Sequence, residues 1–374
     1  PMSDRARHLF KQELRQKINQ FKINVLCEKW PYKVSDSEHL MHGCGQLRPT
    51  HQPFGPVVDF TYLWSVSSNT IQNVYFLGMG ALGTMYAAKL QTLDESLVKI
   101  VVDEERRRQY EQTAITINGE DHSFPYLTPS IKAPAADLII VAVKEYQLAA
   151  ALLLIEPFVG PDTFFLSLLN GISSEVAIGK AYGAERVLYA FGIGMDALRI
   201  GRSVNYADMG YIVFGESDNC ISPRVEALKA LFDAAGIPYQ VPADIHHALW
   251  FKFMLNVAVN QVSALLRVPF GVFAANQEAR DLLVLVAREV QAVAQQKGIA
   301  LSDEDIGKMV SIVVGLNPSG RTSMLQDVDA GRRTELDTFA GSLIREGEAL
   351  GVPTPINRFL YEAITLLEKG SLIP

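Results

Sequence analysis

The sequence is poor in cysteine, has no excess of basic charge and contains no long uninterrupted apolar run. Three cysteines in 374 residues cannot form a disulfide framework and fit a reducing compartment, so we expect a cytoplasmic protein. The formal net charge of −7 argues against a general nucleic-acid-binding protein, because such proteins usually carry a basic surface. No apolar stretch reaches the roughly 20 residues of a transmembrane helix, so we expect no membrane association.

What remains is the composition of an ordinary globular protein, with 48% apolar and 20% charged residues. The length of 374 residues suffices for two domains with a sizeable core. Residues 1–72 form an N-terminal extension whose structure and role the sequence leaves open. Within this extension, Cys27, His39, His42 and Cys44 do not have the paired spacing of zinc ligands, so we predict no metal site.

The most informative segment is a glycine-rich turn between an apolar strand, predicted at residues 74–77, and an alanine-rich helix. In dinucleotide-binding folds the first glycine permits a tight turn and the second lets the backbone approach the pyrophosphate. The third lets the helix pack closely on the strand, and the helix N-terminus presents unpaired N–H groups to the phosphates. The predicted cofactor-binding residues here are Gly78, Met79, Gly80, Ala81, Leu82 and Gly83. A second strand ends at Asp103, where such folds bind the ribose.

Strand-like runs alternate with helical segments up to about residue 242, and only helical patterns follow. Continuous apolar runs, typical of strands buried on both faces of a parallel sheet, predict strands at 74–77, 98–103, 138–143, 163–169, 187–191 and 211–214. Later patterns predict helices at 245–266, 278–297, 303–314, 335–350 and 355–368. We therefore predict an α/β protein. A Rossmann-like doubly wound domain over 73–242 precedes an all-helical domain over 243–374, with the active site between them.

One predicted helix of the second domain carries a row of polar residues. Lys252, Asn256 and Asn260 are spaced at i, i+4 and i+8, which places them on one face of an otherwise apolar helix. A surface helix could carry such a row, but the other faces are so apolar that most of this helix must be buried. We therefore interpret the row as the lining of a wet cleft.

Five segments taken together resemble ketopantoate reductase: GMGALG, VAVKEYQ, LLNGI, LWFKFMLNVAVN and SMLQDVDAGRRTELD. The resemblance runs from about residue 73 to the C-terminus and does not include the extension. It implies the reduction of 2-dehydropantoate to pantoate with a nicotinamide cofactor, in the pathway to pantothenate and coenzyme A. The small-molecule partner would be a 2-oxo acid.

The resemblance also assigns roles to individual residues. Lys252 and Glu335 take the catalytic positions, and Asn256, Asn260 and Ser323 take those of substrate contacts. From the residues alone, Glu335 would be a surface acid among arginines and Ser323 a helix N-cap.

The resemblance places Lys144 and Asn170 on the cofactor side of the cleft. From the residues alone, each follows a predicted strand at the edge where such folds bind ligands, but each could also be an ordinary turn residue.

The choice of cofactor stays open at the level of sequence. The resemblance implies NADP(H), with an arginine after the second strand for the 2′-phosphate. Asp103 occupies that position here and favours NAD(H), because a carboxylate hydrogen-bonds a ribose hydroxyl and repels a phosphate. Three arginines at 106–108 offer an alternative phosphate contact.

Two other functions are compatible with the sequence. One is a related reductase acting on another 2-oxo acid, and the other is a non-catalytic protein that senses a dinucleotide. The lysine in the polar row counts against a sensor, which has no need of a proton donor. The chain is expected to be a monomer or a homodimer.

Overall fold

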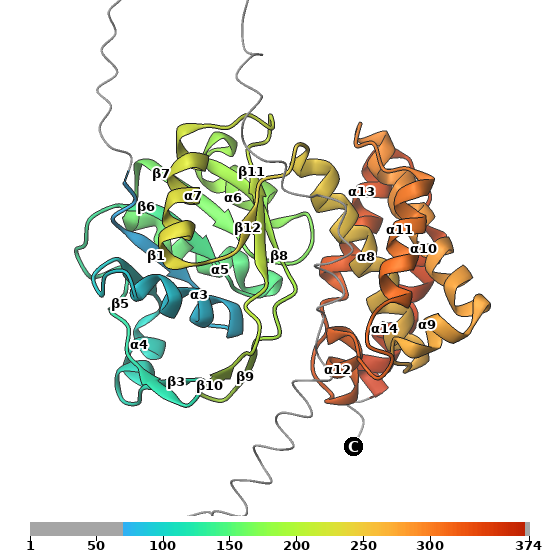
Figure 1. Ribbon diagram of the computed structural model, residues 1–374, viewed down its shortest axis with the longest axis horizontal. Coiled ribbons are helices and arrows are strands. Elements are labelled where there is room, and N and C mark those ends of the chain that lie inside the picture. The colour runs from blue at the N-terminus through green and yellow to red at the C-terminus, as the bar shows by residue number, and fades with distance from the viewer. Residues whose placement is uncertain (1–69, 371–374) are drawn as a thin grey trace, which may run out of the picture.

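The computed structural model describes residues 70–370, and its first half is built on an eight-stranded sheet (Figure 1). The strand order is β12-β11-β8-β7-β6-β1-β2-β5. The strands are β1 (Val74–Leu77), β2 (Val98–Val101), β5 (Tyr126–Leu127), β6 (Ala136–Val141), β7 (Val159–Ser167), β8 (Val187–Ile193), β11 (Tyr211–Gly215) and β12 (Tyr239–Gln240). The pairs from β5 to β8 are parallel, and β11 runs antiparallel to β8. The cysteines and histidines at 27–44 lie outside the described residues.

Helices cover both faces of this sheet, as the apolar strands require. Alternate residues of a strand point to opposite faces. Phe76 of β1 belongs to the core shared with α3 (Ala81–Gln91) and α7 (Pro223–Ala235). Its neighbour Tyr75 belongs to the core shared with α5 (Glu145–Ile155) and α6 (Ser174–Tyr182). The sheet is therefore doubly wound.

A second, four-stranded sheet of order β4-β3-β10-β9 was not predicted. Its strands are β3 (Ile115–Ile117), β4 (Glu120–His122), β9 (Leu198–Ile200) and β10 (Ser203–Asn205). Asn118 and Gly119 form the two-residue turn between β3 and β4 with φ of 48° and 92°, the backbone that a tight hairpin demands. Three-residue strands are too short to produce a recognisable alternation of polar and apolar residues.

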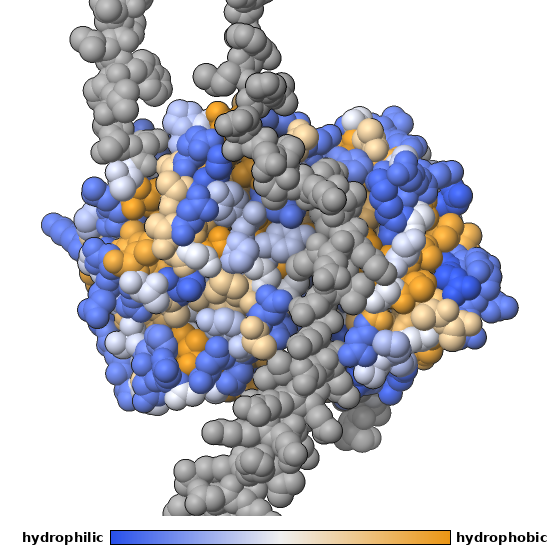
Figure 2. Space-filling model, viewed as in Figure 1, coloured by the Kyte–Doolittle hydropathy of each residue, from blue (hydrophilic) through white to orange (hydrophobic). Residues whose placement is uncertain are grey.

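Helices make up the second half of the described chain, and α8 (Ile245–Leu266) lies at the junction with the sheet (Figure 1). The others are α9 (Gly271–Ala275), α10 (Gln277–Gln296), α11 (Asp303–Val314), α12 (Ser323–Asp329), α13 (Ser342–Leu350) and α14 (Pro355–Gly370). Although α8 is long and apolar enough to cross a membrane, 78% of its apolar window is buried inside the protein. Its apolar character is therefore that of a core helix. On the face shown in Figure 2, hydrophilic residues dominate the outline and hydrophobic residues form smaller patches.

These elements confirm the predicted fold class: a Rossmann-like sheet followed by a helical domain. One predicted helix, 335–350, was wrong at its start. Glu335 lies in the preceding turn, and a π-helical turn (Asp337–Gly341) comes before α13. The Thr334 hydroxyl accepts a hydrogen bond from the Leu336 N–H at 3.2 Å, and so satisfies one of the donors that the start of a helical segment leaves without an internal partner.

Candidate active site

The glycine turn after β1 has the geometry that a dinucleotide-binding loop needs. Gly78 has a φ of 111°, and a Cβ there would lie 2.6 Å from the Ala142 carbonyl oxygen. A Cβ on Gly83 would lie 2.2 Å from the Gly78 oxygen, so α3 can approach the strand only with glycine at this position. A Cβ on Gly80 would meet only the Ala142 carbonyl oxygen, at the ordinary contact distance of 3.6 Å, so the protein itself has room for a side chain at this exposed glycine.

The start of α3 fits the pyrophosphate of a nicotinamide dinucleotide. No side chain caps this helix, and its first turn contains no acidic residue that would repel a phosphate. Ala81 and Leu82 form the first turn, while the Met79 side chain is buried in the sheet core. Met79 can therefore contact a ligand only through its backbone.

Asp103 was predicted as the last residue of the second strand, but β2 ends at Val101, and Asp103 lies just beyond it as the cap of α4 (Glu104–Glu111). Its Oδ1 accepts the Arg106 backbone N–H at 2.7 Å, and its Oδ2 lies 3.6 Å from the Arg106 guanidinium. Glu104 and Glu111 hold Arg107, each at 3.1 Å. Carboxylates therefore engage Arg106 and Arg107, two of the three arginines considered for a 2′-phosphate contact, and the sequence did not reveal this.

The polar row on α8 lies on a mostly buried helix. Asn256 and Asn260 are 8% and 6% exposed, and Lys252 is half-buried. The Asn260 amide donates to the Asn256 carbonyl at 3.1 Å. Its oxygen accepts from the Ser323 hydroxyl at 3.3 Å, so α8 and α12 meet at this point. The cap of α12 is Thr322 rather than Ser323, which leaves the Ser323 hydroxyl on the Asn260 side.

Glu335 joins the two halves of the site. Its Oε1 lies 3.2 Å from the Lys144 ammonium, and its Oε2 accepts from the Asn170 amide at 3.1 Å. Lys144 follows β6 and Asn170 follows β7, so both come from the carboxyl edge of the parallel sheet. The Glu335 side chain is only 15% exposed, and its negative charge acts on Lys252. The structure thus assembles predicted residues that lie far apart in the sequence.

Lys252 has an unusual protonation equilibrium. Burial lowers the pKa of its ammonium group to about 8, and the charge of Glu335 opposes this shift. Such a group is mostly protonated at neutral pH yet gives up its proton more readily than an exposed lysine. A cation in this environment can stabilise negative charge on a carbonyl oxygen and then donate a proton to it.

A second contact across the site was not predicted. The Arg333 guanidinium lies 4.9 Å from the ring centre of Tyr146 on α5, and it also pairs with Asp337 at 3.0 Å. Arg333 is two residues from Glu335, and Tyr146 is two residues from Lys144, so this contact runs beside the Lys144–Glu335 ion pair. Proximity in sequence to two predicted site residues was the only available clue.

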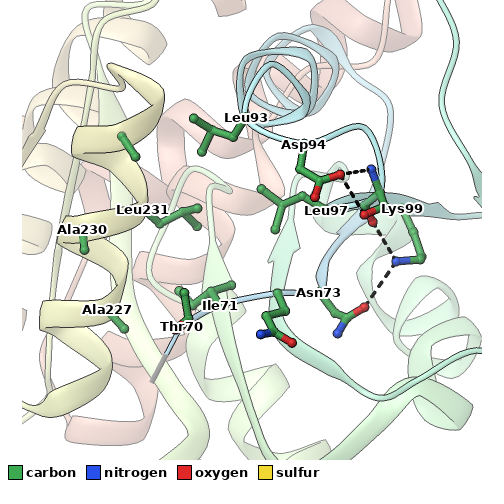
Figure 3. Close-up of a pocket in the computed structure, with 13 residues that line it drawn as sticks. Thr70, Ile71, Asn73, Leu93, Asp94, Leu97, Lys99, Ala227, Ala230 and Leu231 are labelled. Carbon is green, nitrogen blue, oxygen red and sulfur yellow. Dashed lines mark hydrogen bonds between the residues drawn. The ribbon is translucent and has the colours of Figure 1, made fainter. Parts of the chain in front are cut away.

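A separate hollow of about 760 Å³ lies at the opposite end of β1 (Figure 3). Residues 70–73, Leu93 and the alanine-rich side of α7 line it. Its polar groups are bonded to one another, because Lys99 donates to Asn73 at 3.3 Å and Ser96 donates to Asp94 at 2.8 Å. None of the predicted site residues lines this hollow, so we do not assign the chemistry to it.

Comparison with known proteins matches both halves of the chain. The family model described as "Ketopantoate reductase PanE/ApbA" matches residues 74–219, and "Ketopantoate reductase PanE/ApbA C terminal" matches residues 244–368. The 2-dehydropantoate 2-reductase of Archaeoglobus fulgidus is 27% identical over 303 residues, which cover 80% of this chain and 99% of the relative.

Two solved structures share the fold. A PanE/ApbA family ketopantoate reductase from Ralstonia eutropha is 26% identical, with a TM-score of 0.70 over 80% of this chain and 99% of the other. D-mandelate dehydrogenase, in a ternary structure with NADH and anilino(oxo)acetate, is 23% identical. Its TM-score is 0.71 over 80% of this chain and 100% of that chain.

Proposed function

Because this chain belongs to the ketopantoate reductase PanE/ApbA family, we propose that it reduces 2-dehydropantoate to pantoate, a step toward pantothenate and coenzyme A. The observation that carries the proposal is the convergence of Lys144, Asn170 and Glu335 beside a lysine with a lowered pKa. The nicotinamide cofactor supplies the hydride when it is bound. The residues of this chain bind the 2-oxo acid, orient it and supply the proton.

Lys252 is the proposed proton donor. Addition of hydride to the ketone carbon develops negative charge on the ketone oxygen, and an ammonium group directed at that oxygen stabilises the charge. Transfer of one proton from Lys252 to this oxygen completes the hydroxyl group of the product. The pKa of about 8 suits a donor that works near neutral pH.

The remaining groups suit the substrate. Asn256, Asn260 and Ser323 present amide and hydroxyl donors, which bind a carboxylate or hydroxyl without adding charge. Glu335 is the acceptor in the site and is proposed to orient Lys252 or to accept a substrate hydroxyl. In the described structure it binds Lys144 and Asn170 instead. Substrate binding would then exchange some of these contacts for contacts with the ligand.

We propose NAD(H) as the preferred cofactor. Asp103 presents a carboxylate beyond β2, and its side chain remains 42% exposed for a ribose hydroxyl. A 2′-phosphate at this place would meet that carboxylate, and Arg106 and Arg107 are already engaged with acids. The NADH found with D-mandelate dehydrogenase favours the same choice. With so few cysteines, a cytoplasmic location is the corresponding proposal.

The test is the initial rate of NADH and NADPH oxidation by purified protein, with and without 2-dehydropantoate. We expect oxidation that depends on 2-dehydropantoate and is faster with NADH. The assignment of substrate would be refuted if the oxidation rate were the same with and without 2-dehydropantoate, or if no oxidation occurred in its presence. A reversed ratio of rates would refute only the assignment of cofactor.

A second candidate is a reductase for another 2-oxo acid, favoured by the structural similarity to D-mandelate dehydrogenase. A panel that includes the 2-oxo acid corresponding to mandelate separates the two candidates by their kcat/KM. Cofactor binding without turnover on any member of the panel would point instead to a sensor of dinucleotides.

A further inference from the structure

A buried network of acids and hydroxyl groups lies beneath the two loops that carry Lys144 and Asn170. Glu175, in the first turn of α6, is 3% exposed. Its carboxylate accepts a hydrogen bond from the Ser174 hydroxyl at 3.0 Å, and Ser174 accepts one from Ser167 at 2.8 Å. Both serines are fully buried, and Ser167 is the last residue of β7. The network therefore links the strand that leads to Asn170 with the helix that follows it.

A second acid extends the network to the neighbouring loop. Glu145 begins α5 directly after Lys144, and its Oε1 accepts from the Ser173 hydroxyl at 2.7 Å. Ser173 lies three residues beyond Asn170. This single hydrogen bond ties the loop after β6 to the loop after β7. The other oxygen of Glu145 is buried and has no hydrogen-bond partner within residues 70–370.

Glu175 differs from an ordinary buried ion-paired acid. Glu216 is 8% exposed but forms an ion pair with Arg224. No cation pairs with Glu175 in the part of the chain that the structure describes. Besides the Ser174 hydroxyl, the backbone groups of Glu175 itself and of Ala190 on β8 hydrogen-bond to the carboxyl, and the charge of Glu145 acts on it from α5. Tyr189 of β8 feels the charge of Glu175, and the ring centre of His246 on α8 lies 4.6 Å from that of Tyr189.

Burial of such an acid favours its neutral form. Desolvation raises the pKa of Glu175 to about 7, and the nearby charge of Glu145 acts in the same direction. Hydrogen bonds from the backbone of Glu175 itself, from the Ser174 hydroxyl and from the Ala190 backbone favour the ionised form and oppose this rise in pKa. A neutral carboxyl can also donate a hydrogen bond, which an ionised one cannot.

We propose that Glu175 is a positioning residue for the reaction: with Glu145 and the serines Ser167, Ser173 and Ser174, it fixes the two loops and so places Lys144 and Asn170 against Glu335. The buried carboxyl accepts the Ser174 hydroxyl and so joins α6 to the end of β7, and its ionisation in this buried place costs stability. The effect on turnover depends on the proposed function, whereas the titration of Glu175 does not.

The first experiment measures unfolding by urea from pH 5 to 8.5 for the wild type, Glu175→Gln and the surface control Glu120→Gln. A pKa raised above the usual 4.5 gives stability that is present at low pH and is lost as pH rises through about 7. Glutamine resembles the neutral acid and cannot ionise. The wild type should therefore lose stability relative to Glu175→Gln across this range, on the order of a hundredfold in the unfolding equilibrium constant. A constant difference between the two overturns the proposal.

The second experiment compares steady-state kinetics of Glu175→Gln and Glu175→Ala at pH 6 and pH 8. A positioning role predicts near-normal KM values for Glu175→Gln and several-fold higher KM values for Glu175→Ala. It also predicts a pH limb near 7 in the wild type that is absent from Glu175→Gln. Equal impairment of Gln and Ala at both pH values overturns it. If no substrate is turned over, NADH affinity measured by fluorescence replaces KM, and absence of turnover alone then bears only on the proposed function. If Glu175→Ala fails to fold, Ser174→Ala provides a milder variant and should also raise KM. Unchanged KM values for Ser174→Ala would overturn the proposal.

Discussion

Replacement of Lys252 by methionine should greatly reduce turnover and stabilise the protein at the same time. The ammonium group of Lys252 has its pKa lowered from 10.5 to about 8, because burial penalises its charge. The stability that such a group contributes is present above its ordinary pKa of 10.5 and is lost as pH falls through its folded-state pKa of about 8. At pH 7 the wild type therefore bears the full cost of burying this charge.

The size of that cost follows from the pKa. At about 1.4 kcal/mol per pKa unit, the shift from 10.5 to about 8 corresponds to at most about 3.5 kcal/mol. Since Lys252 is half-buried, solvent screening reduces the expected gain for Lys252→Met to about 1–2 kcal/mol at pH 7. Turnover should fall by roughly 10²–10⁴-fold, the usual contribution of a general acid. In the wild type, kcat/KM should decline tenfold per pH unit above about pH 8, as the donor loses its proton.

The assays are urea unfolding followed by tryptophan fluorescence, and cofactor oxidation from pH 6 to 10. Lys297→Met provides a matched control, because Lys297 pairs with Glu346 at 2.6 Å near the surface of the helical half. The control should change stability by less than about 1 kcal/mol and leave turnover intact. A Lys252→Met protein that keeps more than a tenth of wild-type turnover would refute the role as proton donor. A midpoint no higher than that of the control would refute the argument from burial.

Three further substitutions test other parts of the site. Asp103→Arg should shift the ratio of kcat/KM from NADH toward NADPH by at least tenfold, since it replaces a repulsive charge with an attractive one; an unchanged ratio would remove Asp103 from the cofactor site. Gly83→Ala should destabilise the fold, because its Cβ would lie 2.2 Å from a carbonyl oxygen, whereas Gly80→Ala should fold normally and weaken cofactor binding. Thermal melts measure the first effect and NADH titrations the second, and equal melting temperatures for the two variants would contradict this account. Glu335→Gln should move the alkaline limb of the pH profile toward lower pH, because Glu335 raises the pKa of Lys252; a limb that stays in place would show that the two groups do not interact.

The parts of the fold that could be predicted from sequence are those with long, regular patterns. The run 245–266 was predicted with the bounds that the structure gives to α8, because twenty-two residues repeat the helical period six times. Strands β1, β6 and β7 were predicted because apolar residues dominate their buried length. The two-residue strands β5 and β12 carry no periodic signal, and only pairing with a neighbour defines them.

The site was predictable only in part. The spacing of Lys252, Asn256 and Asn260 on one helix was enough to mark α8. Nothing local marks Glu335, which is separated from Asn170 by 165 positions and is surrounded by charged residues in the sequence. The resemblance to ketopantoate reductase singled it out, and the family is now confirmed over both halves of the chain. The ion pair with Lys144 depends on how the two halves pack, which no local pattern contains.

The position of α8 has a consequence for how the chain folds and how it can be divided. Residues of α8 share one hydrophobic cluster with Phe191 and Val213 of the sheet and with Leu283 and Phe339 of the helical half. Neither half can complete its interior without this helix, so the described chain should unfold in a single cooperative transition. A cut near residue 243 would expose a large apolar surface on the sheet-containing fragment. A chimaera that exchanges the helical half between relatives therefore has to take α8 and the β8 and β11 surface on which it packs from the same protein.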